Sequence, residues 1–158
     1  MTVVPRPQIA RVWDSCVIAE YLAGKPAAEH HARPIVESAK RGEIQIWVSL
    51  FAHVEVAFLD GSSETESETK IVAFFSEDYM VPIMLDPFVA EIARKIVRHF
   101  HVKGKDAVHV ASAIRWNVRV FETFDVELIK KLGAMEADAD WNHLQVREPF
   151  FDGQRRMV

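Results

Sequence analysis

The chain has 158 residues, of which 49% are hydrophobic and 27% are charged, and its formal net charge is −4. These values predict one water-soluble domain over residues 1–158 with a single core. No apolar run approaches the ~20 residues that a membrane-spanning helix needs. The lone cysteine, Cys16, excludes an internal disulfide and a cysteine-built zinc site. The first residues lack the pattern of a signal peptide, so we expect a cytoplasmic protein.

The charges are distributed unevenly along the chain. Residues 92–121 hold seven Lys and Arg against one acid, whereas residues 60–78 hold six acids against one Lys. A basic stretch of this kind suits a phosphate backbone, although a solvated helix face would have the same composition. The candidates for phosphate contacts are Arg94, Lys95, Arg98, Lys103, Lys105 and Arg115.

Stretches typical of strands and helices alternate along the chain. In chain order we expect a strand at 9–13, helices at 16–23 and 27–40, a strand at 44–48, a helix at 50–59, a loop at 61–67, a helix at 68–75, a strand at 79–85, helices at 88–100 and from residue 106, a strand at 118–123, a helix at 126–132 and a strand at 143–146.

Local signals support the helix boundaries. Ser15 and Ser49 stand where an N-cap is favoured, and Gly24 stands where a helix ends. Pro34 either kinks the helix expected at 27–40 or divides it in two. Asp86 followed by Pro87 is a typical helix start.

Strands separated by helices predict an α/β fold, a three-layer α/β/α sandwich with a central, mostly parallel sheet. In such sheets the binding sites form outside the carboxyl ends of the strands. Asp14 and Asp125 each follow a predicted strand, Asp106 opens a helix, and Glu55 lies within another. We therefore expect these four acids to meet at one edge of the sheet.

Four neighbouring carboxylates repel one another unless a cation compensates them. A set of oxygen ligands without cysteine favours Mg²⁺ or Mn²⁺, which can assist phosphodiester hydrolysis. The alternative is structural: Asp14, Asp106 and Asp125 would cap helices and Glu55 would pair with a surface base. The residues alone leave both interpretations open.

Four segments of the chain resemble the four motifs of a PIN-domain ribonuclease, in the order of that family: Val12–Ala19, Ser49–Glu55, Lys105–Ala113 and Glu122–Asp125. The resemblance implies a Mg²⁺- or Mn²⁺-dependent endoribonuclease that leaves 5′-phosphate and 3′-hydroxyl ends. It implies that Asp14, Glu55, Asp106 and Asp125 are the catalytic acids, and that the three aspartates hold the metal. Ser15 and Thr123 match the hydroxyl positions that support such a site.

Two further residues stand close to these motifs. His109 lies one helical turn after Asp106 on the same side of its helix, where it either supports the site or makes a structural hydrogen bond. Glu122 departs from the family pattern, which usually has an apolar or small residue at that position.

The size of the chain resembles that of the toxin component of VapBC-type toxin–antitoxin pairs. That resemblance implies an RNA substrate, an antitoxin partner and a homodimer. We expect a basic side chain of the antitoxin to lie near the acidic cluster, because the charges are complementary.

Three other functions stay open at this point. The chain could be an RNA-processing nuclease of the same family without an antitoxin, or a weakly catalytic binding or regulatory module. A phosphatase similar to the haloacid dehalogenases would need a second Asp two residues after Asp14, where this chain has Cys16.

Overall fold

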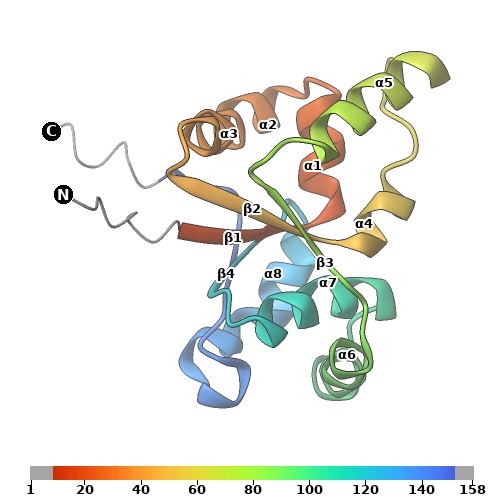
Figure 1. Cartoon of the computed structure of the whole chain (residues 1–158). Coiled ribbons are helices and arrows are strands. Elements are labelled where there is room, and N and C mark those ends of the chain that lie inside the picture. Colours follow the sequence, from red (N-terminus) through yellow and green to blue (C-terminus); the bar gives the residue numbers. More distant parts are fainter. Residues whose placement is uncertain (1–8, 152–158) are drawn as a thin grey trace, which may run out of the picture.

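A computed structural model describes residues 9–151, which form a five-stranded sheet covered by helices on both faces (Figure 1). The strands are β1 (Ile9–Trp13), β2 (Ile44–Ser49), β3 (Met80–Ile83), β4 (Val120–Glu122) and β5 (Gln145–Arg147). Their order is β3-β2-β1-β4-β5, and all neighbouring pairs are parallel. The predicted three-layer α/β fold is confirmed.

The first helix begins directly at the end of β1. Helix α1 (Ser15–Leu22) is capped by Asp14, whose side chain accepts a hydrogen bond from the Ser15 N–H. The prediction that Ser15 is the cap is therefore wrong, because the carboxylate one residue earlier has that position. Gly24 follows the helix with a φ of 72°, a left-handed conformation that favours glycine.

Pro34 divides the second predicted helix in two. Helix α2 (Pro26–His31) is followed by its C-cap, Ala32. Helix α3 (Arg33–Lys40) then starts with Pro34 in its first turn. A proline is tolerated there because the first N–H groups of a helix have no partner within the helix.

Helix α4 (Leu50–Glu55) is four residues shorter than predicted. Ser49 caps it as expected, by accepting a hydrogen bond from the Phe51 N–H at 3.2 Å. The chain leaves helical geometry at Val56, and the backbone N–H of Leu59 instead donates to the Ser67 hydroxyl at 3.1 Å. Glu55 is consequently the last residue of the helix, rather than one within it.

Helix α5 (Glu64–Phe75) starts four residues earlier than predicted, within the segment that we expected to be a loop. Ser63 and Glu66 form a capping box: the Ser63 hydroxyl accepts from the Glu66 N–H, and the Glu66 carboxylate accepts from the Ser63 N–H. This reciprocal pair stabilises a helix start in a sequence that is otherwise polar.

The second half of the chain follows the predicted order with shorter strands. Helix α6 (Pro87–Phe100) is capped by Asp86, α7 (Gly104–Arg115) begins two residues before Asp106, and α8 (Val126–Leu132) has the predicted bounds. Two short 3₁₀ segments, η1 (Gly133–Ala137) and η2 (Ala139–Trp141), lead into β5.

The two faces of the sheet bury separate apolar clusters. One packs beneath α6, α7, α8 and η1 and contains Phe121, and the other packs beneath α1, α3, α4 and α5 and contains Trp13. These helices lie on opposite sides of the sheet in Figure 1. Helix α7 is lined with small buried residues, which let it lie close to the strands. Within residues 9–151, no helix has the length and apolar character needed to cross a membrane.

Candidate active site

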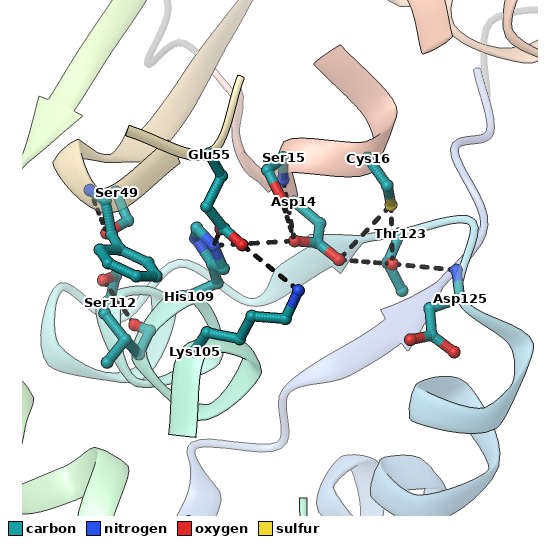
Figure 2. A network of polar contacts seen from close by, with 12 residues as sticks. Asp14, Ser15, Cys16, Ser49, Glu55, Lys105, His109, Ser112, Thr123 and Asp125 are labelled. Carbon is teal, nitrogen blue, oxygen red and sulfur yellow. Dashed lines mark hydrogen bonds and ion pairs between the residues drawn. The ribbon is translucent and has the colours of Figure 1, made fainter. Parts of the chain in front are cut away.

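Asp14 is the centre of the candidate site. It is buried at the carboxyl end of β1, and its backbone N–H donates to the Glu122 carbonyl of β4 at 3.0 Å. Its Oδ1 accepts from the Ser15 N–H at 2.8 Å, and its Oδ2 accepts from the Thr123 hydroxyl at 2.8 Å. Both carboxylate oxygens thus have fixed partners (Figure 2).

Thr123 links Asp14 to the second aspartate of the site. Its hydroxyl also accepts from the backbone N–H of Asp125 at 3.1 Å, while Asp125 Oδ1 caps α8 through the Leu128 N–H at 3.1 Å. Asp14 and Asp125 are therefore helix caps, as the structural alternative predicted. The same contacts bring them to one end of the sheet, so the two interpretations are compatible.

Asp106 lies in the first turn of α7, close enough to the other aspartates to respond to their charge. Burial raises the pKa of Asp106 above its ordinary value, and the charge of Asp14 raises it further. Asp125 has a smaller effect in the same direction. Asp106 does not cap α7, because Lys103 occupies the N-cap position.

Glu55 contacts two groups from α7. His109 Nε2 contacts Glu55 Oε1, and Lys105 Nζ lies 3.5 Å from Glu55 Oε2. An ionised carboxylate only accepts hydrogen bonds, so Nε2 of the buried imidazole carries the hydrogen. The same nitrogen lies 3.9 Å from Asp14 Oδ1. His109 thus lies between Glu55 and Asp14. Its spacing from Asp106 predicted a place near the acids, but not a contact with Glu55.

The chemistry of these side chains suits a magnesium or manganese ion. Among residues 9–151, no three His, Cys, Asp or Glu side chains are grouped closely enough to ligate one ion together. Mg²⁺ commonly binds through one or two carboxylates and retains several waters. Asp14 and Asp106, which are electrostatically coupled, supply that number of oxygen ligands, so the residues present fit the ion.

The six basic residues singled out from the sequence do not form one surface. Lys105 lies at the acidic site, and Lys103 precedes α7 at the same end. Arg115 is at the other end of that helix, 3.8 Å from Asp86 and over the rings of Phe88 and Trp116. Lys95 and Arg98 line a separate cavity, and Arg94 is exposed on α6.

Glu122 is a buried structural residue whose function the sequence analysis missed. It is fully buried, and four donors surround its carboxylate: Arg11 Nη1 at 2.9 Å, Trp13 Nε1 at 3.0 Å, the Phe150 N–H at 3.0 Å and Arg147 Nε at 3.4 Å. An acid within a β-prone run is the only sequence signal for it. The cluster ties β1, β4 and β5 together one residue before Thr123.

The sequence comparison decides the family. The family model described as PIN domain matches residues 11–133, more than half of the chain. The chain belongs to the PIN-domain family. The match contains Asp14, Glu55, Asp106 and Asp125, and PIN domains are generally nucleases that use divalent metal ions.

Several solved structures resemble this PIN domain in fold, and one of them illustrates the likeness. It is the crystal structure of VapBC2 from Rickettsia felis bound to a DNA fragment from their promoter. The TM-score is 0.63 at 11% sequence identity, and the alignment covers 88% of this chain and 98% of that chain. At this identity the likeness concerns the fold alone. None of the curated proteins matches the chain in sequence.

The buried cluster around Glu122 generates a prediction about the stability of this PIN domain. The Glu122→Gln substitution should lower the free energy of unfolding by about 3 kcal/mol, because it removes the buried negative charge to which four donors point. Urea denaturation of both proteins measures the difference. The matched control is Glu91→Gln, since Glu91 pairs with Lys95 at the surface, and it should leave the free energy nearly unchanged. Equal losses of unfolding free energy in the two variants would contradict the stabilising role assigned to Glu122.

The coupling of the aspartates generates a second prediction. In the absence of divalent ions, Asp106→Asn should raise the melting temperature at neutral pH by a few degrees, because it removes a carboxylate charge that Asp14 and Asp125 repel. Differential scanning fluorimetry in a chelator measures this. Asp78→Asn, at an exposed position away from the site, is the control. A lower melting temperature for Asp106→Asn alone would show that its charge stabilises the fold.

Proposed function

We propose that this PIN domain is a Mg²⁺- or Mn²⁺-dependent endoribonuclease and the toxin component of a VapBC-type toxin–antitoxin pair. The proposal rests mainly on one observation: Asp14 is buried at the end of β1 and connected through the Thr123 hydroxyl to Asp125, while its charge raises the pKa of Asp106. Three acids from separate elements thus lie at one end of the sheet, where a cation would reduce the repulsion between them.

Asp14, Asp106 and Asp125 would hold the ion, directly or through the waters that it retains, with Ser15 and Thr123 orienting Asp14. When bound, the cation would offset the acidic charge and stabilise the negative charge that develops on the phosphodiester during hydrolysis. The Ser15 N–H and the Thr123 hydroxyl already fix the two oxygens of Asp14. The carboxylate therefore needs little reorganisation when the site fills.

Glu55 would complete the catalytic site through its two partners on α7. His109 fixes one oxygen of Glu55, and the exposed Lys105 ammonium lies beside the other. The Lys105 side chain is 54% exposed, so its ammonium group can leave Glu55 and bind a phosphate oxygen of an incoming RNA. Such a cation at the rim of an acidic site offsets the repulsion between RNA and the carboxylates.

The partner assignment draws on the structural neighbour. That neighbour is a VapBC2 complex bound to promoter DNA, which supports an antitoxin as the protein partner here. A basic side chain of the antitoxin near Asp14 would block the site by complementing its charge. A short upstream gene for a DNA-binding antitoxin would agree with this assignment. A homodimer remains our expectation.

One observation favours a second function. Because no three ligating side chains of the described residues are grouped in this structure, the chain could instead be a weakly catalytic module that acts through protein partners. Mn²⁺ titration by calorimetry distinguishes the two: binding that Asp14→Asn abolishes supports the nuclease, and the absence of binding by the unmodified protein supports the module.

The first test of the nuclease is cleavage of RNA. The protein should cleave a structured RNA in the presence of Mg²⁺ or Mn²⁺, a chelator should stop the reaction, and Asp14→Asn should abolish it because a central oxygen ligand is lost. Mapping the product ends should give 5′-phosphates and 3′-hydroxyls. Asp60→Asn, at an exposed residue paired with Lys25, should retain full activity. Cleavage by Asp14→Asn at the original rate would refute the site.

A second test isolates the hydroxyl that connects the aspartates. Thr123→Val preserves shape but removes the hydrogen bonds to Asp14 and Asp125, so kcat should fall about 10–100-fold, as for other residues that orient metal ligands. The control is Thr69→Val, because the Thr69 hydroxyl bonds only to a helix carbonyl at the surface. An unchanged kcat for Thr123→Val would show that the hydroxyl does not orient the acids.

A further inference from the structure

A second site lies at the opposite end of α7 from the acidic side chains. A cavity of about 620 Å³ is bounded by Ile92, Ile114 and Trp141 and by the basic residues Lys95, Arg98 and His99. Ile114 is eight residues after Asp106 on the same helix, so it is about 12 Å further along the axis. The cavity is therefore distinct from the candidate active site.

The aromatic wall of this cavity is held in place by its neighbours. The Trp141 ring lies 5.3 Å from the Phe100 ring and 5.9 Å from the His99 ring, measured between centroids. The next residue, Asn142, donates from Nδ2 to the Ile114 carbonyl at 2.9 Å, which attaches the η2 segment to the end of α7. The indole is thus positioned before any ligand arrives.

The rim of the cavity carries positive charge. Lys95 and His99 are four residues apart on α6, so they lie on the same face, and Arg98 stands beside them. Lys95 pairs with Glu91 at 3.4 Å, but both side chains are more than half exposed and the pair is easily exchanged. Arg98 forms no ion pair with another residue of the 9–151 range. Asp140 is the only acid among the lining residues.

We propose that this cavity binds a nucleotide of the RNA substrate that is not adjacent to the cleaved bond, and this inference rests on the proposed function. The base occupies the space beside Trp141 over the apolar floor, and Lys95 and Arg98 bind the adjacent phosphates. Aromatic surfaces beside basic side chains are the usual means of binding single-stranded RNA. The site would therefore contribute to substrate affinity rather than to the chemical step.

Asp140 determines which part of the nucleotide faces it. Its carboxylate only accepts hydrogen bonds and repels phosphate, so the edge of the base, rather than the backbone, faces it. Each RNA base has an N–H group on its edge that can donate to this acid. The contact therefore orients the base within the cavity.

The test measures RNA binding separately from cleavage. A fluorescein-labelled, mixed-sequence single-stranded RNA is titrated in a chelator, which prevents metal-dependent cleavage, and anisotropy gives the Kd. The double variant Lys95→Ala/Arg98→Ala should bind about tenfold more weakly at low salt, and its plot of log Kd against log salt should be shallower by about 1.4, as expected when two phosphate contacts are lost.

Matched variants show whether a loss of RNA affinity comes from a local contact, from the change in overall charge or from misfolding. Lys40→Ala/Arg41→Ala removes the same charge from α3 on the other face of the sheet and should leave Kd and the salt dependence nearly unchanged. Trp141→Leu keeps an apolar side chain but removes the stacking surface, so it should also weaken binding about tenfold while thermal unfolding shows a folded protein. The Trp141→Leu substitution should weaken the binding of poly(U) less than the binding of poly(A).

The outcomes distinguish this inference from the proposed function. If the protein cleaves RNA but the α6 and α3 double variants have equal Kd values, this site is refuted and the nuclease stands. If the α6 variant alone binds RNA more weakly yet no metal-dependent cleavage occurs, the RNA site stands and the nuclease is refuted. A loss of affinity for an antitoxin with no change in RNA binding would reassign the cavity to a protein partner.

Discussion

The alignment of β1 with β4 is the constraint on which the acidic site depends. The two strands pair through only a short register, Val12 with Phe121 and Trp13 with Glu122. The Glu122 carboxylate extends that pairing by binding Trp13 and Arg11 of β1, and its carbonyl accepts from the Asp14 N–H. A shift of one residue between these strands would separate Asp14 from Thr123, and with it from Asp125.

The charges of Asp14 and Asp125 act unfavourably on the ionised form of Asp106, and neighbouring groups stabilise the other acids of the site. Donors from Ser15 and Thr123 stabilise Asp14, and Lys105 and His109 partly offset the charge of Glu55. The nearby thiol adds no charge, because burial and then the charge of Asp14 raise the pKa of Cys16 to about 12. The acidity of the site therefore resides in carboxylates alone. This is consistent with a hard cation and oxygen ligands.

The order of elements and the end of the sheet at which Asp14 and Asp125 lie could be predicted from the sequence, because hydrophobic periodicity and the rule for parallel sheets act locally. Helix boundaries were less predictable where polar side chains decide them. Asp14 competes with Ser15 for the cap of α1, and the reciprocal bonds of Ser63 and Glu66 extend α5 into a polar segment.

Long-range contacts could not be predicted from spacing. The contact between His109 and Glu55 joins residues 54 positions apart, and that between Arg11 and Glu122 joins residues 111 positions apart. The indole of Trp141 reaches its cavity only because the η2 segment folds back onto α7. Such positions depend on how whole layers pack, which a single sequence does not reveal.

The buried cluster also constrains how this chain can diverge. Arg11 and Arg147 both contact the buried carboxylate of Glu122, so replacing this acid removes a negative charge that two basic side chains share. An apolar residue at position 122 would remove both contacts, so it is expected together with changes at the arginines. In related chains these three positions should therefore change together. Either an acid stands with two basic residues, or all three residues are apolar, even where the surrounding surface has changed completely.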